Sequence, residues 1–125
     1  MTARILVIDD EEEVRDILKQ MLELEGYEVI TAKDGNEGIK LFKQNPADLV
    51  ITDIIMPDKE GIETIIELRR EFPDVKIISI SGGGRIGPHD YLAMAKKLGA
   101  ERSFTKPFER KKILQAIEEL LDQKK

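Results

Sequence analysis

The sequence contains no cysteine, no tryptophan and only one histidine among its 125 residues. Without cysteine, disulfide bonds and thiolate metal sites are excluded. No apolar run approaches the roughly 18 residues that a membrane-spanning helix needs, and the first apolar run ends in acids, unlike a signal peptide. Basic residues are not in excess either, because the net charge is −5. We therefore expect a cytoplasmic protein that binds neither membranes nor nucleic acid.

Hydrophobic residues make up 41% of the chain, and its length suits one domain, so we expect residues 1–125 to fold as a single unit. Short, continuous runs rich in isoleucine and valine lie at residues 5–8, 27–32, 49–52, 76–81 and 102–105. Helix candidates follow them at residues 14–22, 35–44, 62–72, 90–98 and 113–121. Continuous apolar runs suit strands that are buried on both faces. The alternation predicts an α/β domain with a parallel sheet.

Polar side chains stand where the predicted strands end. Asp9 and Asp10 follow the first run, Asp53 the third, Ser81 closes the fourth, and Lys106 follows the fifth. Ligands of open α/β sheets bind beyond the carboxyl ends of the strands, so we expect these groups to share one edge. Three converging carboxylates repel one another unless a cation such as Mg²⁺ joins them. A carboxylate in such a site can attack a phosphoryl group.

In this order, these residues resemble the receiver domains of two-component response regulators, including chemotaxis receivers, over essentially the whole chain. The resemblance is carried by four motifs: Asp9-Asp10, Asp53-Ile54-Ile55-Met56-Pro57 with Gly61, Ser81-Gly82, and Lys106-Pro107-Phe108. It implies a flavodoxin-like, doubly wound sheet of five parallel strands in the order 2-1-3-4-5, with five helices.

The resemblance also assigns the metal site. Asp10 would bind Mg²⁺ directly, and Asp9 would assist or act through a water molecule. Asp53 and the backbone carbonyl of Ile55 would complete the protein ligands.

Asp53 would be the phosphoacceptor, Ser81 would move its hydroxyl toward the phosphoryl group, and Lys106 would pair first with Asp53 and then with the phosphate. Pro107 would follow a cis peptide bond. The phosphoryl donor would be a sensor histidine kinase or a phosphotransfer protein. An unidentified downstream target would bind the face formed by the fourth helix, the fifth strand and the fifth helix. The chain would assist its own phosphorylation and dephosphorylation without being an enzyme.

Other interpretations remain for the same residues. The acids at 9–13 could simply cap and charge the first helix. A pseudo-receiver that binds partners without phosphorylation is the main functional alternative. A hydrolase of the aspartyl-phosphate type is disfavoured, since it needs Asp-x-Asp where this chain has Asp9-Asp10-Glu11. Residues 82–87 match G-x-G-x-x-G, a motif of dinucleotide-binding proteins. Dinucleotide binding is disfavoured, because the motif is not in the first strand–helix turn and because the next strand ends in Lys106 rather than in an acid that could bind the ribose.

One position departs from the family pattern. Most receivers carry an aromatic residue three positions before the conserved lysine, and here that residue is Ser103. Strand alternation predicts that Phe104 points to the opposite face from Ser103. Tyr91 is a candidate substitute for the missing ring, and the lone His89 is expected to be idle.

Overall fold

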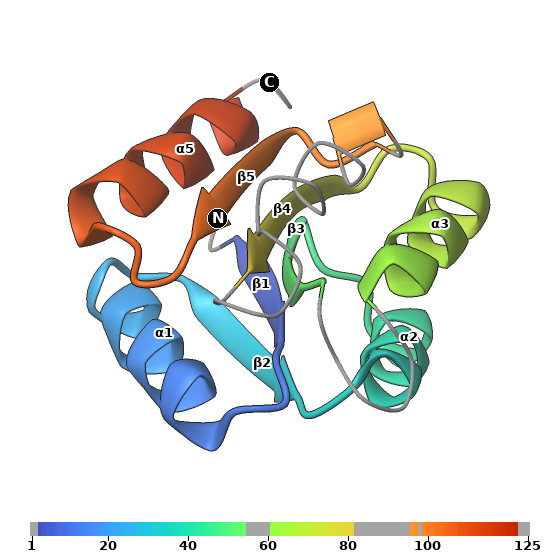
Figure 1. The fold of residues 1–125 in the computed structure, drawn as a ribbon, viewed down its shortest axis with the longest axis horizontal. Coiled ribbons are helices and arrows are strands. Elements are labelled where there is room, and N and C mark those ends of the chain that lie inside the picture. Colours follow the sequence, from blue (N-terminus) through green and yellow to red (C-terminus); the bar gives the residue numbers. More distant parts are fainter. Residues whose placement is uncertain (1–2, 55–60, 82–95, 98, 123–125) are drawn as a thin grey trace.

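The structure is a computed structural model that describes residues 3–54, 61–81, 96–97 and 99–122. The elements follow one another as β1 (Arg4–Ile8), α1 (Glu12–Leu24), β2 (Glu28–Ala32), α2 (Gly35–Gln44), β3 (Leu49–Asp53), α3 (Gly61–Glu71), β4 (Lys76–Ser81), β5 (Arg102–Thr105) and α5 (Arg110–Asp122) (Figure 1). Only Lys96 and Lys97 of the helix expected over 90–98 are described, and both are helical.

The five strands form one sheet in the order β2-β1-β3-β4-β5, and every neighbouring pair is parallel. All five residues of the central strand β3 are buried, as its unbroken apolar run predicts. The flavodoxin-like arrangement and its strand order are thereby confirmed. The carboxyl ends of β1 and β3 are neighbours, because Ile8 pairs with Thr52, and Asp53 pairs in turn with Ile80 of β4.

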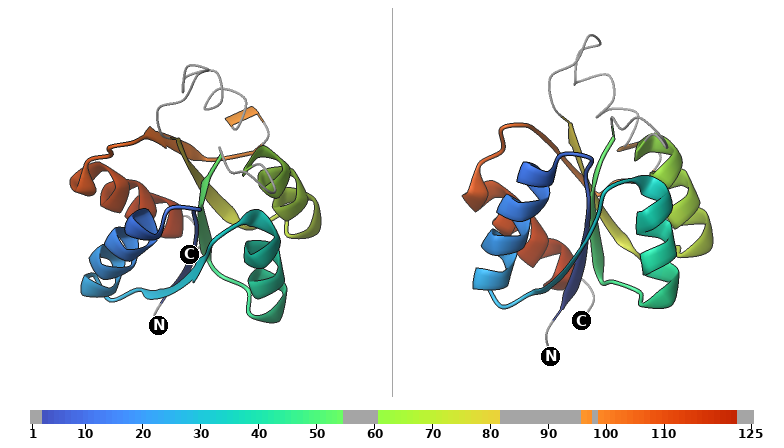
Figure 2. Two further views of the ribbon diagram at one scale, coloured as in Figure 1. Left: turned by 60° about the horizontal axis from the view of Figure 1, so that its bottom comes forward. Right: turned by 90° about the horizontal axis from the view of Figure 1, so that it is seen from below.

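Helices cover both faces of the sheet (Figure 2). On one face, α2 and α3 pack against the strands in a cluster that includes Leu6, Val50 and Ile77. On the other face, α1 and α5 pack against a second cluster that includes Val7 and Ile78. Consecutive strand residues thus point to opposite cores, which explains why the strands are apolar at every position.

Glycine and aspartate mark several of the described helix ends. Gly26 and Gly99 have φ values of +92° and +123°, so both adopt the left-handed conformation that favours glycine. Asp34 caps α2 by accepting a hydrogen bond from the backbone N–H of Glu37 at 2.8 Å. The first helix differs, because Glu11 occupies its N-cap position and makes no side-chain cap.

Arg69 ties three elements together at the end of the sheet away from the acids. Its guanidinium donates to the carbonyl oxygen of Gly99 at 2.6 Å and to Glu101 at 2.8 Å. Glu101 in turn accepts from the backbone N–H of Ile77 at 2.6 Å. The end of α3 is therefore joined to the starts of β4 and β5. Among the described helices, none has the length and apolar character needed to cross a membrane.

Candidate functional site

Four carboxylates gather at the carboxyl ends of β1 and β3. One oxygen from each of Asp9, Asp10, Glu11 and Asp53 lies within 4.8 Å of the others. Asp9 is fully buried and Asp53 is 3% exposed, whereas Asp10 and Glu11 are exposed. The parallel register brings these residues together, since Asp9 directly follows β1 and Asp53 closes β3.

Lys106 places a single ammonium group among these acids. Its Nζ lies 2.8 Å from Oδ2 of Asp53, 2.9 Å from Oδ2 of Asp9 and 2.9 Å from Oε1 of Glu11. The contacts with Asp53 and Glu11 are hydrogen bonds. The Lys106–Pro107 peptide bond is cis, as the resemblance implied.

The site disfavours the charged form of the Asp9 carboxylate. Burial raises its pKa to about 6, and repulsion from Asp53 adds to the rise, although a hydrogen bond from the backbone N–H of Glu11 and the nearby Lys106 oppose it. Its Oδ2 is buried and accepts no hydrogen bond from the part of the chain that the structure describes, so its contact with Lys106 is an ion pair without hydrogen-bond geometry. A buried, charged oxygen of this kind is incompletely satisfied by the protein alone.

In contrast to Asp9, the charged form of Lys106 is stabilised by the site. Burial by itself would lower the pKa of its ammonium group, but the contacts with Asp53, Asp9 and Glu11 outweigh burial and raise the pKa. Lys106 is therefore a fixed positive charge at neutral pH. Taken together, Lys106 and the four carboxylates carry a net negative charge.

This donor set fits a hard divalent cation. The four acids offer oxygen ligands in a small volume, and none of the described residues donates a hydrogen bond to Oδ2 of Asp9. Mg²⁺ prefers oxygen ligands and keeps several of its own waters, so a few carboxylates at a partly open edge suit it.

Ser81 is buried at the end of β4, where it pairs in register with Thr105. Its backbone carbonyl accepts a hydrogen bond from the N–H of Lys106 at 2.7 Å, which fixes the chain segment that carries the lysine. Ile55, Gly82, His89 and Tyr91 lie outside the described residues.

Glu11 was missed as a site residue from the sequence. Its position between the acidic pair and the first helix suggested a cap or a helix-terminal charge, yet its side chain reaches Lys106 across the site. The only signal was its adjacency to Asp10, which does not reveal a contact with a residue so distant in the chain.

Ser103, which stands where most receivers carry an aromatic residue, makes a polar contact. Ser103 shares a 2.8 Å hydrogen bond with Ser79 of the neighbouring strand, and Ser79 is fully buried. Phe104 packs with the cluster under α1 and α5, whereas Ile77, two residues before Ser79, belongs to the opposite cluster. The expectation that Phe104 and Ser103 point to opposite faces is confirmed.

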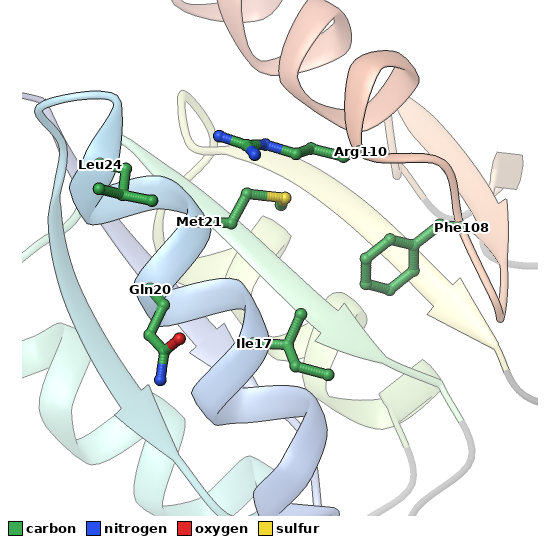
Figure 3. Close-up of a pocket in the computed structure, with 6 residues that line it drawn as sticks. All are labelled: Ile17, Gln20, Met21, Leu24, Phe108 and Arg110. Atoms are coloured by element: carbon green, nitrogen blue, oxygen red, sulfur yellow. The ribbon is translucent and has the colours of Figure 1, made fainter.

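A groove lies between α1 and the start of α5 (Figure 3). It is lined by Ile17, Gln20, Met21, Leu24, Phe108 and Arg110. Ile17 and Leu24 are large apolar side chains with exposed fractions of 59% and 76%. The described lining of the groove includes no carboxylate and no nucleophile.

The model of the response regulator receiver domain matches residues 5–118. The chemotaxis protein CheY of Halobacterium salinarum is 33% identical over 97% of this chain and 98% of that protein. The probable transcriptional regulator ycf27 of Cyanophora paradoxa is 37% identical over 94% of this chain, which spans only 48% of that regulator. A crystal structure of a response regulator receiver domain protein from Clostridium thermocellum superposes with a TM-score of 0.90 at 35% identity, covering 98% of this chain and 96% of that one. The chain belongs to the response regulator receiver domain family of two-component systems.

Proposed function

We propose that Asp53 accepts a phosphoryl group in a two-component signalling pathway, with Mg²⁺ as cofactor. The observation that carries this proposal is the placement of Asp53, almost fully buried, in contact with the Lys106 ammonium and within a cluster of three further carboxylates. A lone acid at the end of a strand would be unremarkable. An acid that shares its site with metal-binding oxygens and a fixed positive charge has what phosphoryl transfer requires.

The donor is a phosphohistidine of a sensor kinase or phosphotransfer protein. An oxygen of Asp53 attacks the phosphorus atom, the new O–P bond forms as the P–N bond breaks, and the electron pair stays on the leaving imidazole nitrogen. Lys106 is placed to donate from Nζ to a phosphoryl oxygen as charge develops on it. The hydroxyl of Ser81, at the end of the adjacent strand, is the candidate donor to another phosphoryl oxygen.

Asp9, Asp10 and Asp53 would hold the Mg²⁺ ion. The backbone carbonyl of Ile55, which lies outside the described residues, would be a further ligand by the family resemblance alone. When bound, the ion neutralises carboxylate charge and draws electron density from the transferred group. The raised pKa of Asp9 supports this assignment, as does its Oδ2, to which no described residue donates a hydrogen bond, since a cation would stabilise the ionised form.

Phosphorylation adds roughly −1.5 to −2 units of charge beside Lys106 and Ser81. We expect this charge to shift an existing equilibrium at the surface that includes β5 and α5, where a downstream partner binds. The chain acts on its own aspartate and is not proposed to turn over a separate substrate.

The test is phosphorylation of the purified protein by a small phosphodonor in the presence of Mg²⁺, followed by intact-protein mass spectrometry. We expect one phosphate adduct in the wild type, loss of the adduct in Asp53→Ala, and retention in Asp16→Ala, which removes an exposed acid of α1. Absence of any adduct, or its persistence in Asp53→Ala, would refute the proposal. Partner binding that is unchanged by phosphodonor would favour the pseudo-receiver alternative.

A further inference from the structure

The ammonium group of Lys106 is closely surrounded by carboxylates in the resting state, with hydrogen bonds to Asp53 and Glu11 and an ion pair with Asp9. It carries three N–H bonds, and three carboxylates lie within 2.9 Å of Nζ, from Asp53, Asp9 and Glu11. A phosphoryl oxygen that approaches Nζ therefore competes with these carboxylates for the ammonium group. Asp9 and Asp53 are buried and fixed by their strands, whereas the Glu11 side chain is 59% exposed and free to swing into solvent.

The side chain of Glu11 does not cap the helix that begins beside it. It is the N-cap residue of α1, with extended φ and ψ of −90° and 117°, but no side-chain cap is made. Its backbone N–H donates to Oδ1 of Asp9 at 2.8 Å, so the start of the helix holds its backbone in place while the carboxylate turns to Lys106. The contact with Lys106 thus takes the side chain away from capping.

We infer that Glu11 is a positioning residue that competes with the phosphoryl group for Lys106. This inference rests on the function proposed above and adds a residue outside the set that the sequence predicted. In the resting protein, Glu11 holds the ammonium and adds negative charge to the metal-binding cluster. In the phosphorylated protein, the Glu11 carboxylate repels the phosphoryl oxygens, and its hydrogen bond with Lys106 is replaced by one from Lys106 to the phosphoryl group.

Glu11 should strengthen Mg²⁺ binding and weaken binding of a phosphoryl group, and these opposite effects make the inference testable. Neutralising Glu11 removes one of four carboxylates from the cluster, so Mg²⁺ alone should bind more weakly. The same change removes a competitor for Lys106 and a like charge beside the phosphoryl group, so a phosphoryl analogue should bind more tightly. A variant that merely disturbs the fold would weaken both.

The experiment compares Glu11→Gln with wild type and with Glu12→Gln, which removes an exposed acid that lies one residue further along and outside the carboxylate cluster. Mg²⁺ affinity is measured by following backbone amide resonances during a titration. Affinity for beryllofluoride, an analogue of the phosphoryl group, is measured by ¹⁹F NMR at saturating Mg²⁺. For Glu11→Gln we expect Mg²⁺ binding weaker by about twofold to fivefold and beryllofluoride binding tighter by about fivefold, as suits an exposed charge.

Equal beryllofluoride affinity in Glu11→Gln and wild type, or weaker affinity in the variant, overturns the inference. So does an effect of the same size in Glu12→Gln, because it would show a general charge effect rather than the contact with Lys106. If the wild type itself binds no beryllofluoride and forms no phosphate adduct, the proposed function is overturned, and this inference falls with it. If only the Glu11→Gln result fails, the proposed function stands.

Discussion

At the scale of single residues, the hydroxyl groups of Ser79 and Ser103 meet beside the proposed phosphorylation site. They share a 2.8 Å hydrogen bond between the register-paired residues of β4 and β5. Ser79 is fully buried, whereas Ser103 is half-buried. A buried hydroxyl that loses its partner cannot turn to water, so the two serines are not equivalent energetically.

We predict that Ser103→Ala lowers the free energy of unfolding by about 1–2 kcal/mol, because it leaves the Ser79 hydroxyl buried without its partner. Ser79→Ala should cost less, about 0.5–1 kcal/mol, since water can reach the hydroxyl of Ser103. The double variant should cost less than the sum of the two. Urea denaturation of the four proteins measures this cycle. Strictly additive costs would mean that the two hydroxyls do not stabilise each other.

The sequence predicted the acids and the lysine of the site because each one directly follows or closes a predicted strand. Asp9, Asp53 and Lys106 needed only the rule that parallel strands end at one edge. Glu11 and Ser79 could not be found in this way. Their contacts depend on which rotamer a side chain adopts and on the strand register, and neither is encoded in local spacing.

At the scale of elements, the start of α3 lies directly against the end of β3. A Cβ atom at Gly61 would overlap the carbonyl oxygen of Asp53 and the Cα atom of Ile54. Both obstacles are backbone atoms, which cannot rotate away as a side chain does. Glycine at this position therefore fixes how closely the helix approaches the strand end that carries the proposed phosphoacceptor.

We predict that Gly61→Ala destabilises the protein by about 2–3 kcal/mol, because the added methyl group forces α3 and β3 apart. Helix propensity alone would give the opposite sign, since alanine is favoured over glycine by up to about 1 kcal/mol. Chemical denaturation distinguishes the two. The displaced Asp53 backbone should also weaken Mg²⁺ binding.

Gly26→Ala is the matched control for this change. Gly26 has a positive φ of +92°, but a Cβ atom there would meet nothing within 4 Å. Only the left-handed backbone opposes alanine, at a cost of about 1 kcal/mol. Gly26→Ala should leave Mg²⁺ binding intact. A Gly61→Ala protein that is as stable as the wild type would show that α3 can shift without cost.

The strands were predictable because a parallel sheet buried on both faces demands unbroken apolar runs. The predicted segments 76–81 and 102–105 coincide with β4 and β5, and the other three differ from β1, β2 and β3 by one residue at one end. The helices were predictable as segments but less so at their ends. Apolar spacing does not mark the first turn of α1 or of α5, whose residues are charged.

At the scale of the whole molecule, folding brings the carboxylate of Asp53 to three acids, Asp9, Asp10 and Glu11, that are already adjacent in sequence, and buries two of the four. The net charge is −5, and four of the acids converge on one edge of the sheet around Lys106. The site therefore opposes folding in the absence of a cation. The arrangement is maintained by the hydrophobic clusters on both faces of the sheet, which fix β1 and β3 side by side.

This opposition should appear in the pH dependence of stability. Folded Asp9 keeps its proton up to a pKa of about 6, whereas the unfolded chain releases it near 3.8. Between these values the folded state binds more protons, so the contribution of Asp9 to stability falls as pH rises. We predict that Asp9→Asn, which keeps an Oδ1 acceptor for the N–H of Glu11, is more stable than the metal-free wild type at pH 7.5, by on the order of 2 kcal/mol. Near pH 4 the two proteins should be equally stable.

Adding Mg²⁺ should reverse this order. Mg²⁺ stabilises only the folded wild type, and it does so more at pH 7.5 than at pH 5, because below about pH 6 a proton competes with it for Asp9. Asp9→Asn should gain much less from the ion at either pH. Thermal unfolding with Mg²⁺ and with a chelator measures the stability gained from the ion by each protein at each pH. Asp16→Asn, which removes an exposed acid of α1, controls for the general loss of one negative charge. A wild-type protein that gains equal stability from Mg²⁺ at pH 5 and pH 7.5 would separate the ion from Asp9, and would place the cation among the exposed acids instead.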